Sequence, residues 1–228
     1  PEGCGGASAF LKNTPIEITE SEVPIHFLRY GLWPDSGGAG KFRGGMSTVM
    51  EFRVASPNTV VTARNRNRSR FASWGVLGGH AGIVSRFTKN PDTDASVELG
   101  NIDVVACDPG DVIRVIGPGA GGYGSPLERD PQRVLQDVRC ELVSTQAARD
   151  AYGVVIDGDA VDGQATQALR KQLAAQAGAA THFDHGQARR AFEAVWTRDR
   201  YAELTAFLAS APLAWRHFLK RKVFDAVA

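Results

Sequence analysis

The sequence lacks the features that mark membrane, secreted and nucleic-acid-binding proteins. None of its apolar runs approaches the roughly 20 residues that a membrane-spanning helix requires, and no charged-then-apolar signal segment stands at the start. The 26 Lys and Arg residues nearly balance the 25 Asp and Glu residues, which leaves a net charge of +1. That charge gives no reason to expect a nucleic acid or an anionic membrane as partner.

Cysteine is scarce as well. Cys4, Cys107 and Cys140 are odd in number, far apart, and not in a CxxC or CxxH arrangement. A disulfide framework is therefore not indicated, and a reduced, cytoplasmic setting fits these cysteines best. The sequence also begins at Pro1 without a methionine, which predicts a processed chain or a piece of something longer.

Glycine, in contrast, is abundant, and five glycines crowd the loop in GDVIRVIGPGAGGYGSPLERDP. Their Gly-x-Gly-x-x-Gly spacing resembles a dinucleotide fingerprint, but Pro126 and a charged stretch precede the next helix, and no Lys-Ser or Lys-Thr follows. Glycine is costly to order unless a loop needs it. We therefore interpret Gly119, Gly121 and Gly122 as residues that bring the backbone close to a ligand or to another piece of protein.

The first half of the sequence is typical of a β-rich domain. Short apolar runs at residues 25–33, 47–54, 59–64, 102–106 and 111–116, with a weaker one at 84–88, alternate with turns rich in Gly, Pro, Ser and Asn. Because no helices intervene, we predict a mostly antiparallel sandwich or barrel over residues 1–126.

Beyond Pro126 the apolar spacing becomes helical, so the predicted fold class is α+β. Asp130 and Ser144 are predicted to cap the two helices of a hairpin over residues 127–156, and Gly153 ends the second helix. A polar linker at 157–163 is expected to lead into helices at 164–176, 187–196, 198–210 and from Pro212 onward. Residues 157–228 would then form a C-terminal helical extension.

Four arginines alternate along the stretch RNRNRSR. On a strand, the period of two would place Arg64, Arg66, Arg68 and Arg70 on one face. Like charges in a row repel one another, so they need carboxylates, phosphates or a partner surface. An ion-paired or solvated face and a surface that binds a partner or an anion both fit this pattern.

Two other loops carry side chains that suit a site. In FASWGVLGGHAG, Trp74 and His80 stand in a Gly-rich turn. His80 is a weak candidate general base, and an ordinary polar contact is the alternative. In PDSGGAGKFRGG, Asp35 and Arg43 either pair across a tight turn or line a shared active site. The catalytic residues themselves stay unknown.

The cluster HFDH at residues 182–185 contains two imidazoles and a carboxylate, which invites a metal-site interpretation. It lacks an evident fourth ligand and the paired spacing of zinc sites, so a polar surface turn between helices fits better. We predict no metal site on this chain.

The ordered motifs resemble the C-terminal part of B-type subunits in the hydantoinase B/oxoprolinase family. The segments that carry the resemblance are KNTPIEITESEVPIHFLRYGLWPDSGG, PDSGGAGKFRGG, RFASWGVLGGHAG and PGDVIRVIGPGAGGYGSPLERDP. The likeness runs from Asn13 to Ile156, and more loosely over FDHGQARRAFEAVWTRDRYAELTAFLASAP. B-type chains are much longer, so we expect a fragment or a separately encoded or processed piece.

The resemblance implies an enzyme that works as a complex. Its members include N-methylhydantoinase, 5-oxoprolinase, caprolactamase and acetone or acetophenone carboxylase, and the A-type partner binds ATP and Mg²⁺. The expected function is ATP-dependent hydrolysis of a cyclic amide, of hydantoin, 5-oxoproline or lactam type, in a cytoplasmic hetero-oligomer. This chain alone is expected to be inactive. A divalent metal, zinc or manganese, would be bound by the N-terminal portion of the B-type subunit and none by this chain.

Within such a complex we expect a set of residues to line the substrate channel or an interface. They are Asp35, Arg43, Arg64, Arg66, Arg68, Trp74, Gly119, Gly121, Gly122 and Tyr123. Two other functions stay open: part of an ATP-dependent ketone carboxylase, and a non-catalytic module that holds such a complex together.

Overall fold

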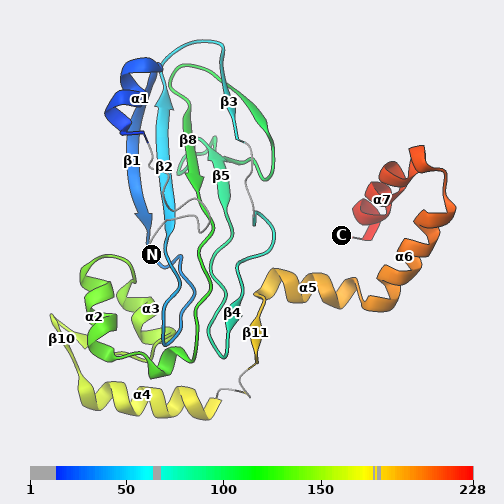
Figure 1. Cartoon of the computed structure of the whole chain (residues 1–228). Coiled ribbons are helices and arrows are strands. Elements are labelled where there is room, and N and C mark those ends of the chain that lie inside the picture. The colour runs from blue at the N-terminus through cyan, green and yellow to red at the C-terminus, as the bar shows by residue number, and fades with distance from the viewer. Residues whose placement is uncertain (1–13, 64–67, 177, 179–180, 228) are drawn as a thin grey trace. The chain divides into compact units, whose positions relative to one another are not determined.

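The computed structural model describes residues 14–63, 68–176, 178 and 181–227, and the chain divides into two compact units (Figure 1). Unit 1 is Pro1–Gly186 and unit 2 is Gln187–Ala228. All of the described strands and the helices α1 to α4 belong to unit 1, whereas α5 to α7 form unit 2.

Unit 1 is built on a five-stranded antiparallel sheet with the strand order β1-β2-β8-β5-β6. The strands are β1 (Ile25–Trp33), β2 (Ser47–Val54), β8 (Val112–Ile116), β5 (Arg86–Lys89) and β6 (Val97–Glu98). The β-branched residues of β2 and β8 suit a pleated surface, and Val49, Val54 and Ile113 are fully buried. The predicted limits of β1 and β2 are confirmed.

A small antiparallel sheet of β3 (Thr59–Thr62) and β7 (Val104–Cys107) supplies the second layer of the core. Phe52, Phe87 and Ile113 of the large sheet pack with Val105 and Cys107 of the small one. The predicted antiparallel β-rich fold is thus confirmed in a two-layer form. A barrel is wrong for the described residues, because the large sheet stops at β1 and β6 instead of closing on itself.

Three helices lie beyond the end of the sheet at which β1 and β8 finish (Figure 1). They are α2 (Pro131–Arg139), α3 (Thr145–Asp150) and α4 (Gly163–Gln176); a further short helix, α1 (Ile16–Glu22), precedes β1. Asp130 accepts a hydrogen bond from Gln132 N, and Ser144 Oγ accepts one from Ala147 N, which confirms both predicted N-caps. A second core joins α2 and α3 to the loop after β1: Ala39, Val134, Val143, Ala148, Tyr152 and Val154.

The linker expected at residues 157–163 is wrong. The strands β9 (Ile156–Asp157) and β10 (Ala160–Val161) pair there as a short hairpin, and its turn contains Gly158 with φ 55°. Gly158 and Asp159 are the two central residues of the turn, and glycine at the first of these positions favours such a turn. The chain divides after Gly186, and α4 lies with unit 1, where Arg170 donates a hydrogen bond to Tyr152 O at 3.0 Å.

Unit 2 consists of the helices α5 (Gln187–Val195), α6 (Arg198–Ser210) and α7 (Leu213–Val227), as the apolar spacing predicts. Four aromatic side chains hold them together: Phe192, Trp196, Tyr201 and Phe224, with the rings of Trp196 and Phe224 stacked at 4.5 Å. Among the described residues, no helix has the length and apolar character needed to cross a bilayer.

Candidate functional site

Three glycine-rich loops meet where β8 ends, and their backbones hydrogen-bond to one another. The loops are residues 36–45, 74–83 and 117–124, which we call the glycine junction. Gly38 N donates to Ala120 O at 2.8 Å, and Gly122 N donates to His80 O at 2.9 Å. Segments that lie far apart in the sequence are therefore joined by main-chain atoms, and the side chains at the junction are few.

The backbones at this junction lie too close together to admit side chains. A Cβ atom on Gly119 would lie 1.7 Å from Ser36 O, and one on Gly121 would lie 1.8 Å from Trp74 O. Real Cβ contacts essentially never fall below 3.0 Å. Neither glycine has a positive φ, so close approach is what requires glycine here. A Cβ on Gly122 would likewise lie 2.2 Å from Ala39 O.

Most N–H groups of the loop after β8 donate hydrogen bonds to protein carbonyls. Gly119 N donates to Ile83 O at 3.1 Å, and Ala120 N donates to Gly45 O at 3.0 Å. A phosphate-binding loop needs N–H groups that point toward the ligand. This loop does not fit a nucleotide phosphate, which agrees with its departure from the dinucleotide fingerprint.

One side of the junction carries a row of paired residues from four segments. Tyr123 bridges Phe42 on one side and Val76 on the other, and Phe183 of β11 (Phe183–Asp184) pairs with Val76 of β4 (Gly75–Val76). Paired residues share a face of a sheet, and the rings of Phe42 and Tyr123 lie 6.2 Å apart. Trp74 and His185 extend the row, with their rings 6.1 Å apart. We call this set the aromatic face: Phe42, Trp74, Val76, Tyr123, Phe183 and His185.

The cluster HFDH is not the turn between helices that we expected. Asp184 lies on β11, where its Oδ2 accepts a hydrogen bond from Ala81 N at 2.9 Å and its Oδ1 accepts one from Gly186 N at 3.0 Å. This carboxylate anchors β11 to the glycine junction. Within the ranges that the structure covers, no group of three or more His, Cys, Asp or Glu side chains suits a metal ion.

The arginine row divides into two parts. Arg64 and Arg66 lie outside the described residues. The alternation on a strand is wrong for Arg68 and Arg70, because β3 ends at Thr62 and Arg68 lies in a turn with φ 59°. The guanidinium of Arg68 lies 4.9 Å from the centroid of the Trp74 ring, so Arg68 borders the aromatic face.

His80 is exposed at the rim of the junction. Its backbone helps to hold the junction together, since His80 N donates to Ala39 O at 2.7 Å and His80 O accepts from Gly122 N. The side chain is left facing outward beside the loops, so its part in catalysis stays a prediction.

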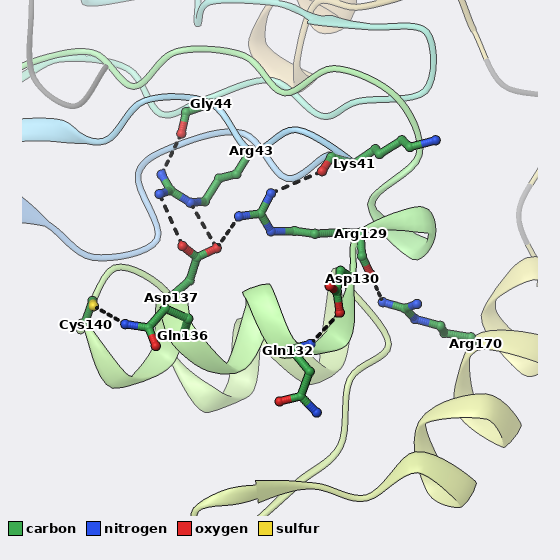
Figure 2. A network of polar contacts seen from close by, with 10 residues as sticks. All are labelled: Lys41, Arg43, Gly44, Arg129, Asp130, Gln132, Gln136, Asp137, Cys140 and Arg170. Atoms are coloured by element: carbon green, nitrogen blue, oxygen red, sulfur yellow. Dashed lines mark hydrogen bonds and ion pairs between the residues drawn. The ribbon is translucent and has the colours of Figure 1, made fainter.

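A buried ionic cluster ties the loop of residues 36–45 to the helices (Figure 2). Asp137 of α2 accepts hydrogen bonds from Arg43 at 3.3 and 3.4 Å and from Arg129 at 2.8 Å, and the three side chains are only 7–11% exposed. Arg129 also donates to Lys41 O, and Arg170 donates to Arg129 O. Buried charges are stable only when they are paired and hydrogen-bonded, which this arrangement achieves for Asp137.

Asp35 and Arg43 reach different helices. Arg43 contacts Asp137 on α2, whereas Asp35 Oδ1 accepts a hydrogen bond from Ser144 N at 2.8 Å, next to the start of α3. Both charged side chains thus anchor the glycine loop to the helical layer. Asp137 and Arg129 were missed by sequence reasoning. The available signal was weak: Asp137 follows the buried Val134 by three residues and so shares its helix face.

Tyr152 lies beside this cluster and is almost fully buried. Burial raises the pKa of its phenol to about 12, although Arg129 and Arg43 act in the opposite direction. The phenol therefore stays protonated through the neutral range and does not serve there as a base.

Comparison with known proteins places this architecture in a family. The family model described as hydantoinase B/oxoprolinase matches residues 3–126, which is more than half of the chain and includes the whole glycine junction. The chain belongs to the hydantoinase B/oxoprolinase family.

Two relatives and two solved structures illustrate the membership. The chain is 37% identical over 162 residues to an uncharacterized protein of Methanocaldococcus jannaschii, with 69% of this chain and 28% of that protein covered. It is 35% identical over 175 residues to the beta subunit of caprolactamase from Pseudomonas jessenii, with 73% and 30% covered. The crystal structure of that ATP-dependent caprolactamase aligns with a TM-score of 0.51 at 32% identity, over 69% of this chain and 28% of the other. Nucleotide-free acetone carboxylase shares the fold, with a TM-score of 0.60 at 23% identity, over 72% and 26%.

The chain thus spans less than a third of the length of the curated relatives it matches. The greater part of each relative has no counterpart in this sequence.

The close packing of the glycine junction can be tested by adding one methyl group. Gly119→Ala should destabilise the fold by about 3 kcal/mol, the upper end of the usual cost of overpacking, because the carbonyl of Ser36 would have to move. Gly31→Ala on β1 is the matched control: nothing lies within 4 Å of the added carbon, and the change should stay below about 1 kcal/mol. Urea unfolding followed by circular dichroism measures both. Equal losses at the two positions would contradict the packing argument.

The buried cluster predicts a large cost for removing its carboxylate charge. Asp137→Asn leaves two buried guanidinium groups without their counter-charge and should lower the free energy of unfolding by about 3–5 kcal/mol. Asp92→Asn removes a carboxylate that also pairs with an arginine, Arg114, but is 75% exposed, and it should have little effect. If thermal unfolding shows similar losses for both variants, the cluster does not anchor the loop.

Tyr152 predicts a late step in an alkaline titration. Its pKa is raised from 10.0 to about 12, so the stability it contributes is fully present below pH 10 and is lost as the pH rises from 10 to 12. Ultraviolet absorbance should show one of the four tyrosines ionising in this late step, together with unfolding. The Tyr152→Phe variant should lack it. If the Tyr152→Phe variant instead loses an ordinary step near pH 10 and keeps the late step, the late step does not belong to Tyr152.

Proposed function

We propose that this chain is the C-terminal portion of the B-type component of an ATP-dependent hydrolase of cyclic amides, of lactam, hydantoin or 5-oxoproline type. The observation that supports it most is the similarity to the beta subunit of an ATP-dependent caprolactamase. The family match over the whole glycine junction supports it further. The complex would be a cytoplasmic hetero-oligomer. The free cysteines Cys107 and Cys140 are consistent with a reducing setting.

ATP and Mg²⁺ belong, in this proposal, to an A-type partner. The glycine loop of this chain has most of its amides engaged and offers no phosphate cradle. Amide hydrolysis is slow without activation. Transfer of the γ-phosphoryl group of ATP to the amide oxygen would activate the amide for attack by water. A divalent metal, if the enzyme uses one, would be held by the remaining portion of the B-type subunit, since the described residues gather no ligand group.

The part played by this chain is to shape one wall of a shared site. Arg68, Trp74, His80 and Tyr123 face outward beside the glycine junction, and we propose that they line the shared site or its interface, with Arg64 and Arg66 as further candidates. Asp35, Arg43 and the glycines at 119, 121 and 122 would act by holding that wall in place. A chain with this division of work should be inactive alone.

Ketone carboxylation is the second candidate, and the fold shared with acetone carboxylase favours it. Cyclic-amide hydrolysis ranks first because the caprolactamase is more similar in sequence over a like share of this chain. A purely structural module is the third candidate, since the described side chains at the junction supply no complete catalytic set.

A substrate assay on the complete complex separates these candidates. With ATP and Mg²⁺ present, caprolactam, hydantoin or 5-oxoproline should each be tested for ring opening coupled to ADP release. We expect one of these cyclic amides to be consumed without bicarbonate, and no turnover by the isolated chain. Acetone and acetophenone with bicarbonate are the matched comparison. The hydrolase proposal would be wrong if a ketone were consumed only with bicarbonate and no cyclic amide were consumed.

A further inference from the structure

We propose that the aromatic face is the surface against which the remaining portion of the B-type polypeptide packs. The inference rests on the proposed function only for the identity of the whole enzyme. The surface itself is defined by this chain: Phe42, Trp74, Val76, Tyr123, Phe183 and His185.

The aromatic face exposes more apolar surface than isolated residues would explain. The exposed fractions are 56% for Phe42, 49% for Tyr123, and 46% for both Trp74 and Phe183. Single exposed apolar residues are ordinary, but contiguous apolar patches mark interaction sites. Four large rings on four adjoining segments form such a patch.

The face is also held rigid before any partner arrives. Phe42 and Tyr123 exchange two backbone hydrogen bonds of 3.0 Å, and Val76 N donates to Gly122 O at 2.9 Å. The same loops contain the tightly packed glycines, whose backbones lie against neighbouring backbone carbonyls. A surface that is already ordered loses little conformational entropy on binding. This favours a stable, well-packed contact over an adaptable one.

The chemistry of the face indicates what covers it. The guanidinium of Arg68 lies over the Trp74 ring, and the carboxylate of Asp184 is engaged by backbone amides. Permanent interfaces resemble a domain core cut in half, whereas transient ones are more polar. The face therefore suits a permanent apolar contact, with a carboxylate of the occupant opposite Arg68.

The length of the relatives indicates which polypeptide covers the aromatic face. This chain spans 28–30% of the matched relatives, so about 70% of a B-type polypeptide remains to be packed against it. We infer that the occupant is that remaining portion, because a permanent apolar contact between parts of one B-type component fits this face.

Site-specific photocross-linking in the complete complex tests the proposal. The photoreactive residue p-benzoylphenylalanine is placed at Tyr123 and, in a second variant, at Phe42, each of which is half exposed. Both should cross-link to the B-type portion outside this sequence. The control is the same residue at Val60 on β3, which is 58% exposed but lies in the small sheet; it should give about tenfold less of that product.

Peptide mapping of the products decides the outcome. Cross-links at both positions to the remaining B-type portion support the proposal. Cross-links to the A-type partner, to a second copy or to residues 187–228, or no cross-link at either position, overturn it. Circular dichroism verifies that each variant is folded. The readout does not depend on turnover. If the cross-links form as expected but the unsubstituted complex hydrolyses no cyclic amide, only the proposed function is contradicted.

Discussion

The structure of unit 1 depends on backbone packing against backbone at the glycine junction. Carbonyls such as Ser36 O and Trp74 O occupy the space where Gly119 and Gly121 would otherwise carry a Cβ atom. Protein interiors are usually filled by interlocking side chains. At this junction the filling atoms belong to the main chain, and the usual adjustment by rotamer changes is not available.

The layers on either side of the junction are held in different ways. On the helical side, Asp137 draws Arg43 and Arg129 together and so fixes the loop after β1 to α2. On the opposite side, paired strands present the aromatic face. The junction thus connects the helices, through its hydrogen-bonded loops, to a surface of outward-facing rings. That surface and its rim, rather than the glycine loop itself, are where side-chain chemistry is available.

Local signals in the sequence were enough to predict much of the fold. β1 and β2 have long apolar runs bounded by turns, and Asp130 and Ser144 carry their capping chemistry within three residues. Pairings over long sequence distances were not predictable. β11 pairs with β4 across about a hundred residues, and the two strands have only two residues each. Asp137 likewise became recognisable as the partner of Arg43 only once α2 was placed.

The glycine junction also constrains the order in which unit 1 can fold. Its contacts join residues near 38, 80 and 120, so each closes a long loop. The glycines themselves have no side chains that could draw the loops together early, and contacts between distant residues form slowly. During synthesis, the N–H of Gly38 cannot reach its native partner, the carbonyl of Ala120, until Ala120 has left the ribosome. The junction should therefore be among the last parts of the domain to assemble, after the two side-chain cores have brought its loops together.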